Sequence, residues 1–222
     1  MYERIATQLI SLSARTISPG YLDEDALAEY AERKDRHVYA YLAGIPESGV
    51  EELGPADLDR DDCEVRGLAL GGRYTSEEYG EVVSVSVDRI LGTTCLREDD
   101  FPVSQFKGLA VDPDFQGHGI GTALSATAMA ELLKNPPVVS MIWQRDNPSN
   151  RKIAEYYSDN RMATFEDYFP PEWQCPECGF DNDCDCGVVM YGWFADDRPI
   201  RQAPSVGAAS ASGPEEIRTA NQ

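Results

Sequence analysis

Lysine is scarce in this sequence, and signals for membrane insertion and secretion are missing. Only 19 of the 222 residues are lysine or arginine, and only two are histidine. The lysines are Lys34, Lys107, Lys134 and Lys152. No run of about 18 apolar residues occurs, which excludes a membrane-spanning helix. The segment from Met1 to Arg15 lacks the basic and then apolar layout of a signal peptide, so we expect a cytoplasmic protein.

Acidic residues outnumber basic ones, and the net charge is -20. A charge of this sign repels phosphate backbones, which argues against nucleic acid as a partner. Acid-rich, lysine-poor surfaces resemble those of proteins from salt-loving microbes, in which concentrated salt screens the self-repulsion. We therefore interpret most acidic residues as a solvated surface and not as catalysts.

The hydrophobic pattern predicts an alternation of short strands and helices within one domain. The strands are predicted at Ile5–Ile17, Val65–Leu70, Val82–Ile90, Phe106–Val111, Val138–Trp143, Phe165–Phe169 and Val188–Phe194. The helices are predicted at Leu22–Lys34, Thr122–Lys134 and Asn150–Asn160. Residues 38–43 fit either a helix extension or a strand, and the acidic segment 44–62 predicts a long loop. Residues 198–222, rich in small residues and proline, predict a disordered tail.

A glycine-rich turn, Gln116 to Gly121 (Gln-Gly-His-Gly-Ile-Gly), joins a predicted strand to a predicted helix. Glycines permit positive φ and allow a ligand to approach the backbone closely. The N–H groups of such a turn converge, and the following helix directs its positive end to the same place. The turn therefore predicts an anion site suited to a pyrophosphate.

Three phosphate-binding patterns compete for this turn. A Walker loop needs a lysine that is absent here, and a dinucleotide fingerprint needs Gly-x-Gly-x-x-Gly, a different spacing. The third pattern, Gln/Arg-x-x-Gly-x-Gly/Ala, is the acyl-CoA signature of the GNAT acetyltransferase superfamily. Gln116-x-x-Gly119-x-Gly121 matches it fully.

The resemblance to this superfamily extends beyond the turn. The stretch from Leu109 to Leu124 resembles the central motif of the family, and Asn150-x-x-Ile153-x-x-x-Tyr157 is similar to its helix motif Asn-x-x-Ala-x-x-x-Tyr. The resemblance implies an α/β (α+β) GNAT fold, a mixed central sheet with helices on both faces. We place the acetyltransferase domain at residues 1–197 and the tail at residues 198–222.

By this resemblance the cosubstrate is acetyl-CoA. Its pyrophosphate would lie on the backbone of the glycine turn, and its pantetheine would pair with the preceding strand like an extra strand. The thioester would lie between that strand and Val138–Trp143. The residues implied in binding are Leu109, Ala110, Val111, Gln116, Gly117, His118, Gly119, Ile120, Gly121, Thr122 and Asn150.

The chemistry implied is direct attack of an amine, from a small molecule or a protein, on the thioester. A backbone N–H near Val111 would polarise the carbonyl oxygen. The resemblance assigns protonation of the departing thiolate to Tyr157. The alternative is that Tyr157 is a core aromatic residue, a role that the neighbouring Tyr156 could fill instead. Asn150 either contacts the cosubstrate or caps its helix.

The general base is not assigned by the sequence. Where many relatives carry a carboxylate, this chain offers Gln105 on one strand and Gln144 or Arg145 after another. A water chain or a carboxylate from the loop at 44–62 would serve instead. The missing carboxylate also keeps a second interpretation open, a non-catalytic acyl-CoA sensor of the same fold.

Four of the six cysteines are clustered near the C-terminus. Cys175-Pro-Glu-Cys178 and Cys184-Asp-Cys186 supply four thiols within twelve residues, a set that suits tetrahedral zinc. We predict a structural zinc site in an insert at residues 170–187, with an iron–sulfur site or a redox pair as alternatives. The insert would border either the acceptor site or a subunit contact, for which a homodimer is one arrangement.

Overall fold

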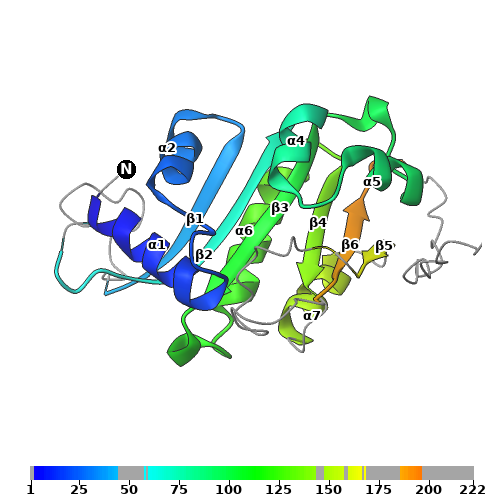
Figure 1. Ribbon diagram of the computed structural model, residues 1–222. Helices are drawn as coiled ribbons and strands as arrows, with labels where there is room; N and C mark the ends of the chain where they lie inside the picture. The colour runs from blue at the N-terminus through cyan, green and yellow to red at the C-terminus, as the bar shows by residue number, and fades with distance from the viewer. Residues whose placement is uncertain are drawn as a thin grey trace, which may run out of the picture.

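A six-stranded mixed sheet forms the centre of the protein (Figure 1). The computed structural model describes residues 3–44, 58, 60–143, 148–157, 160–166, 168 and 186–196, without the side chains of residues 148–150. The strands are β1 (Arg36–Ala43), β2 (Glu64–Tyr74), β3 (Val103–Val111), β4 (Val138–Trp143), β5 (Arg161–Phe165) and β6 (Val188–Trp193). Their order is β1-β2-β3-β4-β6-β5, and β3 and β4 are the parallel pair.

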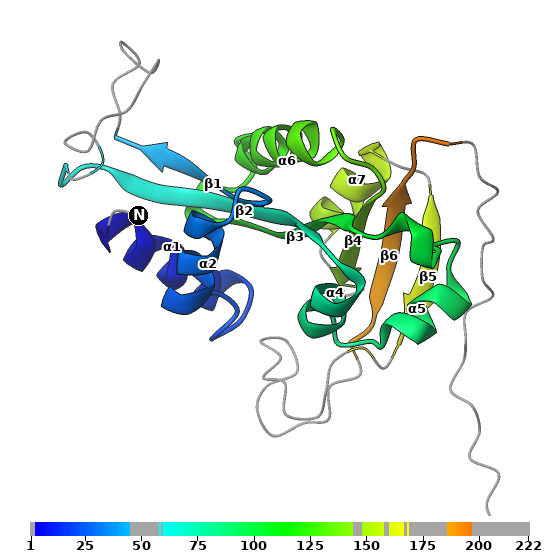
Figure 2. The same cartoon turned by 90° about the horizontal axis from the view of Figure 1, so that it is seen from above.

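Helices cover both faces of the sheet, as the family resemblance implies. Figure 2 shows α1, α2, α4 and α5 on one face and α6 and α7 on the other. The α-helices are α1 (Glu3–Thr16), α2 (Glu24–Glu32), α4 (Ser76–Val82), α5 (Val87–Thr93), α6 (Ile120–Leu132) and α7 (Pro148–Tyr157). Two short 3-10 helices, η1 (Glu98–Asp100) and η2 (Pro113–Phe115), flank β3. In these described parts, no helix has the length and apolarity needed to cross a bilayer.

Helix α6 packs on β2 and β3 through the apolar residues that recur every four positions in the sequence. Ile120, Leu124, Ala128 and Leu132 are all buried. Gly67 on β2 permits this approach, because a Cβ atom there would lie 2.8 Å from the Leu124 side chain. The helix that follows the glycine turn is therefore fixed firmly against the centre of the sheet.

Two predicted strands are helices instead. Residues 5–17 lie mostly in α1, where Ile5, Leu9 and Leu12 form one buried face, a helical spacing that loose alternation in the sequence concealed. Residues 82–90 leave α4, pass through a short bend and enter α5. The hydroxyl of Ser86 accepts a hydrogen bond from the N–H of Arg89 and caps α5, and local capping of this kind outweighs β propensity.

Two further segments differ in detail. Residues 38–43, for which the sequence left two interpretations open, belong to β1, which pairs antiparallel with β2. The fifth strand ends at Phe165, where the prediction began it. Phe165 is almost fully buried and pairs with Val188 of β6, so it lies in a strand as predicted, but at the end of the strand and not at its start.

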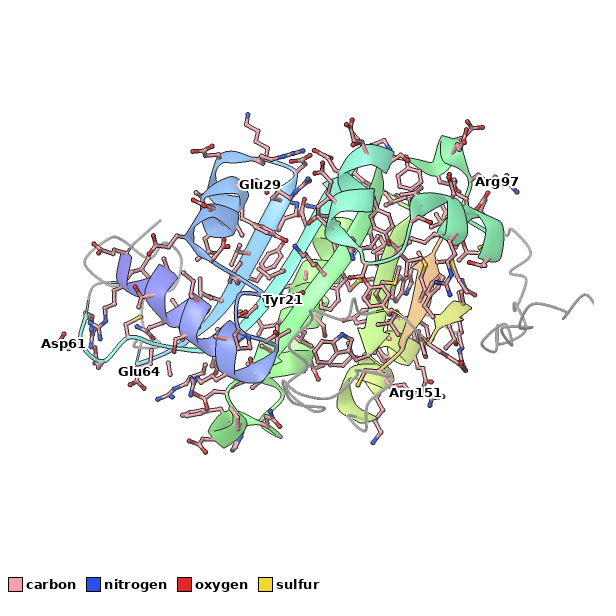
Figure 3. The ribbon with its side chains drawn as sticks, in the orientation of Figure 1. Tyr21, Glu29, Asp61, Glu64, Arg97 and Arg151 are labelled. Carbon is pink, nitrogen blue, oxygen red and sulfur yellow. The ribbon has the colours of Figure 1, made fainter. Side chains whose placement is uncertain are left out.

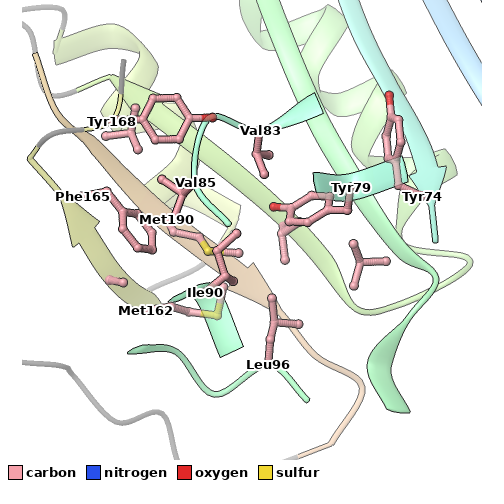
Figure 4. Packing of buried hydrophobic residues seen from close by; sticks show 14 residues of the cluster. Tyr74, Tyr79, Val83, Val85, Ile90, Leu96, Met162, Phe165, Tyr168 and Met190 are labelled. Carbon is pink, nitrogen blue, oxygen red and sulfur yellow. The ribbon is translucent and has the colours of Figure 1, made fainter. Parts of the chain in front are cut away.

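The face that carries α1, α2, α4 and α5 has two separate hydrophobic clusters. One lies under α1 and α2 around Leu9 and Leu27. The other lies under α4 and α5 around Tyr79, Ile90 and Met190, as Figure 4 shows. Residues from the α1–α2 connection and from α4 line one cavity, so this cavity opens between the two clusters.

Candidate active site

The two central strands diverge partway along their length. β3 and β4 pair over three positions only, from Ser104 and Val138 to Phe106 and Ser140. At the last of these positions the Ser140 hydroxyl donates a hydrogen bond to the carbonyl of Phe106, at 3.1 Å. Beyond it β3 stays paired with β2, and β4 with β6, up to their ends. The edge of β3 that faces β4 therefore has no strand partner there among the described residues, and an extended ligand can pair with it.

The turn from β3 to α6 presents backbone N–H groups that no side chain caps. Gly117 and Gly119 have φ values of 79° and 82°, in the left-handed region that favours glycine. Gly119 is the N-cap of α6 and has no side chain to accept hydrogen bonds from the first turn. These N–H groups and the positive end of the helix dipole could hold an anion, the role that the sequence predicts for the turn.

Two side chains of the turn brace its own backbone. The Nδ1 atom of His118 lies 3.0 Å from the carbonyl oxygen of Gln116 and 3.2 Å from that of Phe115. The side-chain amide of Gln116 donates to the carbonyl of Val111 at 3.2 Å. The His118 ring thus folds back on the turn and is not part of the cavity lining.

A buried carboxylate fixes the point where β3 enters the turn. Asp112 accepts hydrogen bonds from Arg66 at 2.9 Å, from Arg15 at 3.2 Å and from the N–H of Asp114 at 3.2 Å. Burial by itself raises the pKa of Asp112, but the hydrogen bonds from Arg66 and Asp114 and the charge of Arg15 lower that pKa below its ordinary value overall. Arg66 also stacks on the Phe115 ring, with its guanidinium carbon 4.3 Å from the ring centroid.

A cavity of about 730 Å³ runs from the glycine turn through the divergence of β3 and β4. It reaches the connection between α1 and α2 at Tyr21 and the end of α4 at Glu81. Trp143 and Val188 line the β4–β6 side. The cavity therefore joins an anion site at one end to a chamber under α1, α2 and α4 at the other.

Most of the predicted site residues line this single cavity. They are Leu109, Ala110, Val111, Gln116, Gly117, Gly119, Ile120, Gly121, Thr122 and Tyr157. Asn150 lies in the first turn of α7, but its side chain is outside the described part of the structure. Gln144 and Arg145 also lie outside the described residues, so the structure does not place these candidates for a base.

The two neighbouring tyrosines at the end of α7 have different surroundings. Tyr157 is partly buried and lines the cavity, whereas the side chain of Tyr156 is 81% exposed. Their rings form a T-shaped, edge-to-face pair, with centroids 5.1 Å apart. The spacing from Asn150 thus selects the tyrosine that faces the cavity.

Gln105 lines the cavity on β3, where the resemblance led us to look for a base. It is only 3% exposed, and its Oε1 atom has no hydrogen-bond partner among the described residues. Glu81 of α4, an exposed residue, is the only acidic residue in the described lining of the cavity. Sequence reasoning missed Glu81 because it interpreted this segment as the approach to a strand.

Tyr21 and Lys107 also line the cavity and were not singled out by the sequence. The hydroxyl of Tyr21 donates to the carbonyl of Lys107 at 2.8 Å, which ties the α1–α2 connection to β3. Burial raises the pKa of Tyr21 well above its ordinary value. The one signal for Lys107 in the sequence was the scarcity of lysine.

The predicted metal ligands fall largely outside the described residues. Cys175, Cys178 and Cys184 are not described, and Cys186 lies just before β6. Within the described ranges, no three histidine, cysteine or acidic side chains gather in a group that could hold a metal ion. The zinc insert is therefore neither supported nor tested by the geometry, and it stays a prediction.

Comparison with known proteins connects this geometry to a family. Residues 56–160 match the model of the Acetyltransferase (GNAT) family. This range contains β2, β3, the glycine turn, β4 and α7. No curated protein matches the chain in sequence.

Solved structures share the fold. NAA60 from Arabidopsis thaliana in complex with acetyl-CoA has a TM-score of 0.55 and 10% identity, over 88% of this chain and 96% of that chain. The same protein with a bisubstrate analogue has a TM-score of 0.56 and 11% identity, with the same coverage of 88% and 96%. The ribosomal-protein-S18-alanine N-acetyltransferase from Escherichia coli has a TM-score of 0.50 and 12% identity, over 90% and 93%. The match to this family over residues 56–160 and the shared fold together support an acetyl-CoA-dependent acyltransferase.

Proposed function

We propose that this protein is an N-acetyltransferase that transfers the acetyl group of acetyl-CoA to a primary amine by direct attack. The observation that carries the proposal is one cavity that joins the uncapped glycine turn, the divergence of β3 and β4, and Tyr157. These are the parts that a pantetheine thioester and an attacking amine require. The acceptor is a small molecule or a protein amino group.

The glycine turn would hold the pyrophosphate of acetyl-CoA. Its N–H groups carry partial positive charge and need no lysine or arginine, which suits a chain with few basic residues. The unpartnered edge of β3 from Leu109 to Val111 would then pair with the amide groups of the pantetheine arm. This arrangement leads the thioester toward the end of the cavity where Tyr21 and Glu81 lie.

Direct transfer requires one proton to leave the amine and one to reach the thiolate. The amine nitrogen forms a bond to the acetyl carbon, the carbon–sulfur bond breaks, and the sulfur takes a proton to leave as the thiol. Tyr157 would supply that proton through its hydroxyl group. A backbone N–H near Val111 would stabilise the negative oxygen of the intermediate.

Glu81 would receive the proton that the amine loses, directly or through water. Support for this role comes from its place in the lining, where it is the only described carboxylate. Gln105 has no acidic proton to exchange and would accept a hydrogen bond instead. If no group acts as a base, the alternative function is a non-catalytic acyl-CoA sensor, which the glutamine at position 105 favours.

An acetylation assay separates the two functions. We expect release of the CoA thiol with a panel of primary amines, and a fall in kcat of about 100-fold in Tyr157→Phe. The matched control is Tyr156→Phe, which removes the same hydroxyl from an exposed neighbour and should leave kcat unchanged. Calorimetric binding of CoA without thiol release from any amine would instead establish the sensor.

The acceptor class has partial support from the structures that share this fold. Their names refer to a bisubstrate analogue and to the alanine of a ribosomal protein. We therefore include peptides with free amino termini in the panel, beside small primary amines. Peptides would enter on the side of the cavity bordered by the α1–α2 connection and α4.

We also propose a structural zinc ion held by Cys175, Cys178, Cys184 and Cys186, on the basis of the spacing of these cysteines. Purified protein should contain about one zinc per chain by mass spectrometry, and the double substitution Cys175→Ser with Cys178→Ser should lose it. Protein free of metal with four reactive thiols would contradict this proposal. The cytoplasmic location, the domain limits and a homodimer stay predictions.

A further inference from the structure

Lys107 occupies an irregular position in β3. Leu70 of β2 pairs with Gly108, and the next residue, Gly71, pairs with Phe106, so Lys107 has no partner across the ladder. Such a bulge places two consecutive residues on the same face of the sheet. Here Lys107 and Gly108 both face Tyr21, whose oxygen would lie 2.7 Å from a Cβ atom at position 108.

Lys107 lines the cavity. Its Nζ atom lies 6.0 Å from the centroid of the Tyr21 ring, and none of the ion pairs within the described residues involves it. Burial and the charge of Arg36 lower the pKa of Lys107, while the charges of Glu29 and Asp23 act in the opposite direction. A partly buried cation in this setting is stabilised by any anion that enters the cavity.

The two carboxylates that act on Lys107 from a distance are engaged elsewhere. Glu29 lies 3.4 Å from Arg36 and 3.7 Å from Arg33. Asp23 accepts a hydrogen bond from the N–H of Ala26 and caps α2. Figure 3 shows Glu29 on α2, apart from Tyr21 at the α1–α2 connection. The anion that completes the surroundings of Lys107 must therefore come from outside these residues.

The position of Lys107 suits binding of the acceptor and not of the phosphates of acetyl-CoA. Lys107 lies four positions before Val111 at the end of β3, a distance of about 13 Å along a strand. The glycine turn lies beyond Val111. Lys107 is two residues from Gln105 and shares its chamber with Tyr21 and Glu81, where the acceptor amine would approach.

We propose that Lys107 binds a carboxylate of the acceptor, so that the enzyme prefers amines with an acidic group close to the amino group. This inference rests on the proposed function. The shared chemistry is found in a free acidic amino acid and in a peptide with an acidic residue near its amino terminus. Lys107 then determines specificity, while Tyr157 and Glu81 carry out proton transfer.

The test compares acceptors that differ in one charge. Steady-state thiol release is measured with glutamate α-amide against glutamine α-amide, which has no carboxylate, and with a peptide that begins Ser-Glu against one that begins Ser-Gln. We expect kcat/KM to favour the acidic member of at least one pair by about tenfold or more, because a hydrogen bond between charged groups typically strengthens binding by at least that factor. Preference in the first pair identifies a small molecule, and preference in the second identifies a peptide.

Substitutions then assign the preference to Lys107. Lys107→Met should raise the KM for the acidic acceptor by about tenfold while leaving the KM for acetyl-CoA unchanged, and Lys107→Glu should favour a Ser-Lys peptide. Lys134→Met is the matched control, because Lys134 is exposed and pairs with Glu131 at 2.5 Å. Calorimetry of the same peptides on CoA-saturated protein reports their binding without turnover.

Three outcomes decide the matter. A preference for acidic acceptors that Lys107→Met abolishes supports the inference. Acetylation of neutral and acidic acceptors at equal rates, or a preference that Lys107→Met retains, overturns it and leaves the proposed function standing. Absence of thiol release with every amine, in protein that binds CoA, overturns the proposed function and this inference with it.

Discussion

The Asp112 carboxylate accepts a hydrogen bond from the Arg66 guanidinium at 2.9 Å, across two neighbouring strands at the entrance to the glycine turn. Arg66 comes from β2 and Asp112 directly follows β3, so the bond holds the end of one strand to its neighbour. Asp112 also caps η2 through the N–H of Asp114. The glycine turn thus follows a residue that is held both to β2 and to η2.

Loss of this carboxylate should weaken the turn. Asp112→Asn removes the negative charge and one of the two acceptor oxygens that Arg66, Arg15 and the N–H of Asp114 share, so we expect a loss of about 1–3 kcal/mol in the free energy of unfolding. Chemical denaturation measures this loss, and calorimetry should show weaker CoA binding. Asp114→Asn is the control, since Asp114 is exposed and contributes its backbone N–H alone. Equal stability of the two variants would show that the buried carboxylate does not support the turn.

Glu78 gives a prediction for the dependence of stability on pH. Hydrogen bonds from the N–H of Thr75 and from Arg33 lower its pKa to about 2. Because the folded pKa lies below the unfolded one, the stabilisation is complete above about pH 4.5 and is lost as the pH falls toward 2. Glu78→Gln should therefore be less stable than the wild type at pH 7, and the gap should close below pH 4. A gap that stays constant across this range would contradict the assignment.

Substitution of Gly119 tests whether the turn needs a left-handed backbone conformation at this position. With a φ of 82°, Gly119→Ala should cost about 1 kcal/mol or more in stability and should weaken CoA binding about tenfold. The control is Gly92→Ala in α5, where a Cβ atom meets nothing within 4 Å and φ is not positive. That substitution should be neutral or stabilising. Thermal unfolding with and without CoA compares the two variants.

The sequence predicted the centre of the site far better than its surroundings. The glycine turn, α6 and β4 follow from local patterns, in which residue type and spacing fix backbone geometry directly, and the family resemblance selected the cavity-facing Tyr157. Glu81 and Tyr21 reach the cavity only because α4 and the α1–α2 connection pack on one face of the sheet. The segment that forms most of α1 and the segment that follows Glu81 appeared to be strands in the sequence, so the contribution of these helices to the cavity was hidden.

The buried Asp112 shows a second kind of limit. In the sequence it is one of 39 acidic residues in a chain of net charge -20, and we interpreted such residues as surface. Its two arginine partners are 97 and 46 positions away. Only the antiparallel pairing of β2 with β3 and the packing of α1 bring them together, and no local pattern reports contacts of that range.

Glu81 allows the assignment of the base to be tested by pH. Glu81→Gln should lower kcat about 10- to 100-fold at pH 7 without changing the KM for acetyl-CoA, because the amine must then lose its proton to bulk water. The defect should shrink as the pH rises above the pKa of the acceptor amine, about 8 for an amino terminus, since the free amine then needs no base. Glu77→Gln is the control, an exposed residue one turn earlier on α4 that does not line the cavity. If Glu81→Gln and Glu77→Gln have the same pH profile, the proton leaves by another route, and Gln105 with an ordered water becomes the group to examine.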